Sequence, residues 1–155
     1  MEDSRRCILS VAETIADSVA GYTHVGERAH GFGLYAYCEH QAIERGKHAR
    51  ALDRLIREHG WHGDAGGTLL GSAHRLFIDL KLAISHGEEA VLRELHRGEA
   101  FLLDKIEAAL AGARLDRALA EALRRIAQAV REAVAELASR LRLVTGWDGA
   151  RPSPG

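Results

Sequence analysis

The chain has 155 residues, a length that suits one folded domain with a single core. Hydrophobic residues make up 46% and charged residues 28%, a balance that excludes a disordered body. The net charge of −1 argues against a nucleic-acid partner, and no apolar run is long enough for a membrane span. Cys7 and Cys38 have neither CxxC spacing nor a disulfide framework, so we expect a cytoplasmic protein.

Apolar side chains recur every three or four residues along most of the chain, which is the spacing of one helical face. Asp3 or Ser4 is expected to cap the first helix. Four glycines between Gly60 and Gly67 mark an internal connection that is too short to separate domains. The predicted helices span residues 4–28, 34–59, 69–85, 88–111 and 114–144, and the one over 69–85 is short.

Each long helix carries one apolar stripe and one charged face, so burial of the stripes should drive their assembly. Two short connections and one longer crossover with its own helix are typical of ferritin-like bundles. The sequence therefore predicts an all-α fold, a ferritin-like up-down four-helix bundle with a short extra helix in the crossover between the second and third long helices. In this interpretation residues 1–144 form the bundle and residues 145–155 a flexible C-terminal tail.

Arg45 falls on the apolar face of the second helix, where a plain bundle carries an apolar side chain. A buried arginine needs a carboxylate, because an unpaired charge in an apolar interior costs several kcal/mol. Glu94 and Glu99 flank the core face of the third long helix, so we expect Arg45 to pair with one of them. Such a pair would fix helix register rather than catalyse a reaction. His74 and Arg75 in the short helix are predicted to form a second structural clamp.

Inward carboxylates and histidines can also build a metal site in such a bundle. Glu44 and His48 lie four residues apart on one helical face, and Glu27, Glu94 and Glu99 would complete the ligand set. The last helix has carboxylates but no histidine, so a full di-iron constellation is absent. Iron or another transition metal would suit these ligands. A neutral core histidine is the competing and commoner role for His48.

No catalytic motif is present: no serine lies in a Gly-x-Ser-x-Gly elbow, and Gly60 to Gly67 lacks the ending of a phosphate-binding loop. An enzyme is therefore the less favoured class. The first hypothesis is a non-catalytic bundle that acts through self-association or protein partners. The second is an iron-binding ferritin-like protein with an incomplete or divergent site. The third is small-molecule binding in a cavity left by small residues, although close helix packing also explains these residues: Ala42, Gly46, Ala49 and Gly98.

Two central motifs carry a resemblance to a known family: His74-Arg75-x-Phe77-x-x-Leu80-Lys81 and Glu94-x-x-Arg97-Gly98-Glu99, with Ala109-Leu110, Gly21-Tyr22, Arg45 and Gly60 around them. From about Leu9 to Leu143 the chain resembles a family of small bacterial ferritin-like four-helix-bundle proteins of unknown function. The resemblance implies a bundle with a helical crossover and self-association as a homo-oligomer, and it implies no activity. The chain departs from the family pattern at three positions, where His48 replaces an aromatic residue, Ile106 a tyrosine and Glu136 a histidine.

Overall fold

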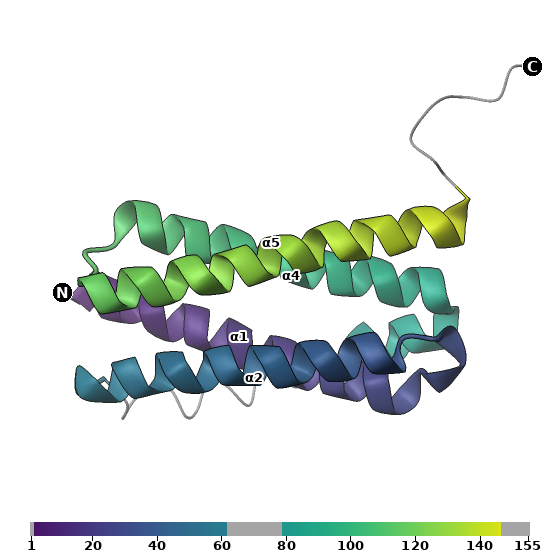
Figure 1. The fold of residues 1–155 in the computed structure, drawn as a ribbon, viewed down its shortest axis with the longest axis horizontal. Coiled ribbons are helices and arrows are strands. Elements are labelled where there is room, and N and C mark those ends of the chain that lie inside the picture. Colours follow the sequence, from purple (N-terminus) through teal and green to yellow (C-terminus); the bar gives the residue numbers. More distant parts are fainter. Residues whose placement is uncertain (1, 62–78, 147–155) are drawn as a thin grey trace, which may run out of the picture.

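A computed structural model describes residues 2–61 and 79–146 (Figure 1). These residues are helical apart from short connections, and no strand occurs among them. Residues 79–86 form a short helix that leads into the last two long helices. The other elements are α1 (Glu2–Arg28), the short 3₁₀ helix η1 (His30–Phe32), α2 (Tyr35–Glu58), α4 (Glu88–Gly112) and α5 (Arg117–Thr145).

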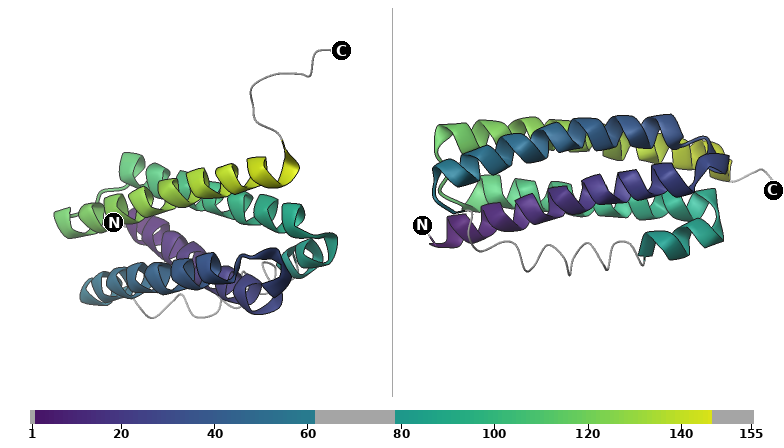
Figure 2. Two further views of the ribbon diagram at one scale, coloured as in Figure 1. Left: turned by 45° about the vertical axis from the view of Figure 1, so that its right-hand side comes forward. Right: turned by 90° about the horizontal axis from the view of Figure 1, so that it is seen from below.

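The four long helices pack side by side as a bundle (Figures 1 and 2). α1 runs antiparallel to α2, and α4 runs antiparallel to α5, whereas α2 and α4 run in the same direction. The end of α2 and the start of α4 therefore lie at opposite ends of the bundle, which is the arrangement expected of a bundle with one long crossover (Figures 1 and 2). Of the predicted short helix over 69–85, the part before Asp79 lies outside the described residues. Of the predicted tail over 145–155, Thr145 belongs to α5, and residues 147–155 lie outside the described residues.

The first and last helices begin at other residues than the sequence predicted, and the contacts at their ends explain the differences. Ser4 lies inside α1 rather than at its cap, and its hydroxyl accepts a hydrogen bond from the Arg114 backbone N–H at 2.9 Å. α5 begins three residues later than predicted because Asp116 is its N-cap, accepting a hydrogen bond from the Leu119 N–H at 2.9 Å. Gly146 ends α5 in a left-handed conformation, with φ at 70°.

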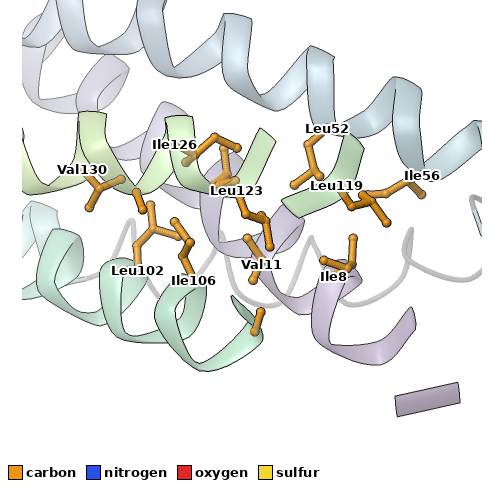
Figure 3. Close-up of a cluster of buried hydrophobic side chains, with 13 residues drawn as sticks. Ile8, Val11, Leu52, Ile56, Leu102, Ile106, Leu119, Leu123, Ile126 and Val130 are labelled. Carbon is orange, nitrogen blue, oxygen red and sulfur yellow. The ribbon is translucent and has the colours of Figure 1, made fainter. Parts of the chain in front are cut away.

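The core consists of two apolar clusters that follow one another along the bundle. All four long helices contribute to both clusters. Figure 3 shows the first cluster, which fills the end of the bundle that holds the start of α1. It comprises Ile8, Val11, Ile15, Leu52, Ile56, Leu102, Ile106, Ala109, Leu119, Leu123, Ile126, Ala127 and Val130. The second comprises Tyr22, Val25, Ala29, Leu34, Cys38, Leu80, Ala83, Val91, Leu92, Leu95 and Leu137.

The outward faces of the helices are charged and carry ion pairs one helical turn apart. Arg57 contacts Asp53 at 2.8 Å on α2, and Arg140 contacts Glu136 at 2.9 Å on α5. Such exposed pairs contribute at most a few tenths of a kcal/mol each. Among the residues that the structure describes, no helix combines the length and the apolar character that a bilayer span requires.

Candidate functional site

Two charged side chains occupy positions where the packing of the bundle would otherwise place apolar ones. On α4 the buried residues Leu95, Glu99 and Leu102 follow the spacing of the core face, so Glu99 points inward. On α2 Arg45 lies midway between the buried residues Cys38 and Leu52. Arg45 and Glu99 are consequently only 1% and 2% exposed to solvent.

Arg45 and Glu99 form a two-pronged ion pair across the bundle. Arg45 Nη1 donates to Glu99 Oε1 at 2.7 Å, and Nη2 donates to Oε2 at 2.5 Å. Nη1 also donates to the Ser18 hydroxyl of α1 at 3.0 Å, and that hydroxyl donates to the Ile15 carbonyl at 2.9 Å. Parallel hydrogen bonds between a guanidinium and a carboxylate are among the strongest polar contacts in proteins. The pair therefore ties α1, α2 and α4 together at one level of the bundle.

Two tyrosines extend this polar cluster. The Tyr22 ring of α1 packs edge-on against the Tyr37 ring of α2, with centroids 6.1 Å apart. The Arg45 guanidinium lies 5.8 Å from the Tyr22 ring centroid, and that of Arg140 lies 4.5 Å from the Tyr37 centroid. Burial, reinforced by the Glu99 charge, raises the pKa of Tyr22 well above its ordinary value, and burial raises the pKa of Tyr37 to about 12. Both phenols are neutral at physiological pH.

The cluster separates the two apolar clusters of the core. Ser18 lies between Ile15 and Tyr22 along α1, just as Arg45 and Glu99 lie between apolar core residues on their own helices. Burial alone lowers the pKa of Arg45, but hydrogen bonds and charge from Glu99 more than offset this effect and raise the pKa. The guanidinium of Arg45 holds both carboxylate oxygens of Glu99, so neither oxygen is open to a reacting group. Its chemistry suits a structural role better than general acid–base work.

The structure distinguishes between the two carboxylates that the sequence offered to Arg45. Glu99 is the partner, whereas Glu94, one helical turn earlier and half-buried, pairs with Arg97 on the same helix. Arg97 also lies 3.8 Å from Asp79 in the short helix. His74 and Arg75, the predicted second clamp, lie outside the described residues.

The candidate metal ligands are not brought together as a set. Within residues 2–61 and 79–146, no three histidine, cysteine or acidic side chains form a group that could hold a metal ion. Glu44 pairs with Lys47 at 2.9 Å, Glu27 is exposed, and Glu99 has both oxygens on Arg45. His48 is half-buried, and burial together with the nearby Arg45 charge lowers its pKa, so the imidazole is neutral at pH 7.

Sequence reasoning missed the polar residues that join the helices near this site. Ser18 keeps the three-and-four spacing between Ile15 and Tyr22, a signal that it faces inward. Lys105 of α4 donates to the Ser10 and Thr14 hydroxyls of α1 at 2.7 and 3.0 Å. No sequence signal indicates these contacts, because they depend on how α1 and α4 are rotated against each other.

The fold and this interior define an all-helical bundle whose core is divided by a buried arginine–glutamate pair. A sequence model described as a domain of unknown function, DUF2383, matches residues 8–112, and the chain belongs to this family. The matched region holds Ser18, Tyr22, Arg45 and Glu99 and ends at the C-terminal residue of α4. No curated protein and no solved structure matches the chain.

Proposed function

We propose that this protein is a non-catalytic helical bundle that acts by association, first with a second copy of itself. The observation that carries the proposal is that the start of α2 and the end of α5 carry exposed apolar side chains. Figure 1 shows that these two helix ends lie at the same end of the bundle. Leu143 is 81% exposed, Tyr35 45% and Val144 39%. Single exposed apolar residues are ordinary, but three at the meeting ends of two helices favour an interface.

The position of these side chains favours a partner that extends the core. Leu143 and Val144 lie two and three residues after Leu141, which packs with Tyr37 against the second apolar cluster. An apolar partner surface would therefore continue this cluster outward, at roughly 25 cal/mol for each Å² of apolar surface removed from water. A second copy offers the same surface, and two-fold dimers with self-complementary interfaces are the commonest protein assemblies.

Sedimentation velocity over a range of protein concentrations tests this association. We expect the wild-type chain to sediment as a dimer and Leu143→Glu to sediment as a monomer, because a buried charge in the interface is costly. Leu82→Glu is the matched control: Leu82 is a comparably exposed leucine on the short helix, and this variant should remain dimeric. A wild-type chain that stays monomeric at every concentration would refute the proposal.

We keep a ferritin-like relationship and iron binding as the alternative proposal. The parallel directions of α2 and α4 support a ferritin-like connectivity. His48 has a neutral imidazole, the form that binds metals, and Glu44 lies one helical turn before it. Anaerobic iron loading followed by elemental analysis tests this alternative. It requires stoichiometric iron that is lost in His48→Ala, and strongly substoichiometric iron in the wild-type protein would exclude it.

A further inference from the structure

Three side chains meet where α2 ends and α5 begins: the imidazole of His59, the indole of Trp61 and the carboxylate of Asp116. Figure 1 shows that these helix ends lie at the opposite end of the bundle from the exposed apolar side chains of the proposed self-association. The role of this group is therefore independent of that association.

The backbone places Trp61 beside the core. His59 ends α2, and Gly60 follows in a left-handed conformation with φ at 72°. The Gly60 N–H donates to the Arg57 carbonyl at 2.9 Å, and the Trp61 N–H donates to the Ile56 carbonyl at 3.1 Å. These two bonds form a Schellman motif, which turns the chain back onto the side of its own helix. Trp61 accordingly packs against the first apolar cluster and is half-buried.

Both nitrogens of the His59 ring face hydrogen-bond acceptors. Nδ1 lies 2.7 Å from the Leu55 carbonyl oxygen, and Nε2 lies 2.5 Å from Asp116 Oδ2. A neutral imidazole has a single N–H and can satisfy only one of these contacts, whereas the imidazolium donates to both. Protonation of His59 thus completes the link between α2 and α5.

The Trp61 ring adds a second contact that favours the imidazolium. The centroids of the His59 and Trp61 rings are 4.5 Å apart, with 39° between the ring planes. An indole ring attracts a nearby cation more strongly than a neutral group. Loss of the proton therefore weakens the contact of His59 with Trp61 as well as its contact with Asp116.

The charges that act on His59 favour the same form. The Leu55 carbonyl makes the largest contribution to raising the pKa of His59, and burial works against it. Asp116 of α5 and Glu58 of α2 are the charged groups involved, and both are carboxylates that raise this pKa further. Because an ordinary histidine titrates at about pH 6.5, the raised pKa moves the titration of His59 toward neutral pH.

We propose that His59 is a pH-controlled latch at this end of the bundle, closed when the imidazole is protonated and open when it is neutral. In the closed state His59 joins the end of α2 to Asp116, and Trp61 lies against its ring. As pH rises and the proton is lost, both contacts weaken together, and the end of α2 is no longer tied to α5. The apolar core beneath the latch does not titrate, so the opening stays local.

Nuclear magnetic resonance titration of the ¹⁵N-labelled full chain tests the latch. The chain has two tryptophans, so Trp147→Phe leaves Trp61 with the only indole signal. We expect the Trp61 indole N–H and the Leu119 amide, which donates to Asp116, to shift together with one midpoint above about pH 6.5. A midpoint at or below that value, or an indole signal that does not titrate, would overturn the proposal.

Two asparagine substitutions show whether Asp116 controls this midpoint. Asp116→Asn removes the carboxylate and keeps the cap of α5, because asparagine caps helices about as well as aspartate. It should lower the midpoint by roughly 0.5 pH unit, the scale of a partly exposed ion pair. Asp53→Asn is the matched control: Asp53 is an exposed carboxylate of α2 that pairs with Arg57, and this variant should keep the wild-type midpoint. Equal midpoints in Asp116→Asn and the wild type would overturn the proposal.

The variant His59→Gln assigns the titration to this residue, which is necessary because the chain has nine histidines. A glutamine side chain gains no proton in this range of pH, so the shared midpoint of the Trp61 and Leu119 signals should disappear. A midpoint that persists in His59→Gln would show that another group causes it, and the latch would be refuted.

Discussion

At the scale of single residues, the core contains a buried ion pair, Arg45–Glu99, whose formation costs desolvation energy and requires a specific geometry. Removing two charges from water costs several kcal/mol per ion, and close two-pronged contacts are needed to offset that cost. Arg45 has such contacts to Glu99, and Ser18 accepts a third hydrogen bond from it. Apolar side chains of similar size would pack here without this cost, so we interpret the pair as a device that selects one helix register.

Substitution of one member of the pair should show how far the contacts between Arg45 and Glu99 offset the cost of burying their charges. We expect Arg45→Ala to lower the free energy of unfolding by about 3–5 kcal/mol, because it leaves Glu99 buried without a cation. The double variant Arg45→Met with Glu99→Leu should regain most of that loss, since neither charge remains. Urea unfolding followed by circular dichroism measures both values. A loss within about 0.5 kcal/mol for Arg45→Ala is what a surface residue shows, and it would contradict the burial described above.

At the scale of helices, His59 links the end of α2 to the start of α5. Its Nδ1 lies 2.7 Å from the Leu55 carbonyl oxygen, and its Nε2 lies 2.5 Å from Asp116 Oδ2. Both neighbours are acceptors, so both ring nitrogens carry a proton when the link is complete. Asp116 caps α5 with its other oxygen, and the Trp61 ring lies 4.5 Å from the imidazole. Protonated His59 therefore stabilises both the end of α2, through Leu55, and the start of α5, through Asp116.

The link should make the stability of the protein depend on pH. The Leu55 carbonyl and then Asp116 raise the pKa of His59, so its contribution is full below the unfolded pKa of about 6.5 and is lost as pH rises through the folded value. The Leu119 N–H and then His59 lower the pKa of Asp116, so its contribution is lost as pH falls through the lowered value. The nearby Glu58 carboxylate adds to the effect on His59.

We therefore expect His59→Ala to destabilise the protein more at about pH 5.5 than at about pH 8. The difference should stay below about 1 kcal/mol because the pair is partly exposed. Chemical unfolding at the two pH values measures it, and His40→Ala, an exposed histidine on the same helix, is the control. An equal loss at both pH values would show that the charged link contributes nothing to stability.

At the scale of the whole molecule, α5 contributes part of both apolar clusters although it lies outside the region that matches the family. The match ends at residue 112, yet α5 buries seven residues in the bundle, including Leu119, Leu123 and Leu137. Without this helix, the side chains of α1, α2 and α4 in both apolar clusters would be exposed to water on one side. The region common to the family thus relies here on a helix outside the match for its burial.

Truncation should show this dependence directly. A chain that ends at residue 114 should lose its cooperative thermal transition, because the apolar faces of α1, α2 and α4 would be open to water. A chain that ends at Gly146 keeps all of α5, which runs to Thr145, and should therefore retain the wild-type transition. Scanning calorimetry compares the two, and a sharp transition in the shorter chain would show that three helices suffice.

The helices and the need for a partner at Arg45 follow from the sequence alone. Apolar spacing within one helix depends on residues three and four positions apart, so it is visible without knowledge of any neighbour. The tertiary structure decided which carboxylate faces Arg45, and it placed Glu99 in the core and its neighbour Gly98 at the surface. Adjacent helical positions differ by about 100° in direction, so both were compatible with the pattern of α4. Only the packing of α1, α2 and α5 around α4 fixes that rotation, and with it the ion pair between Arg45 and Glu99.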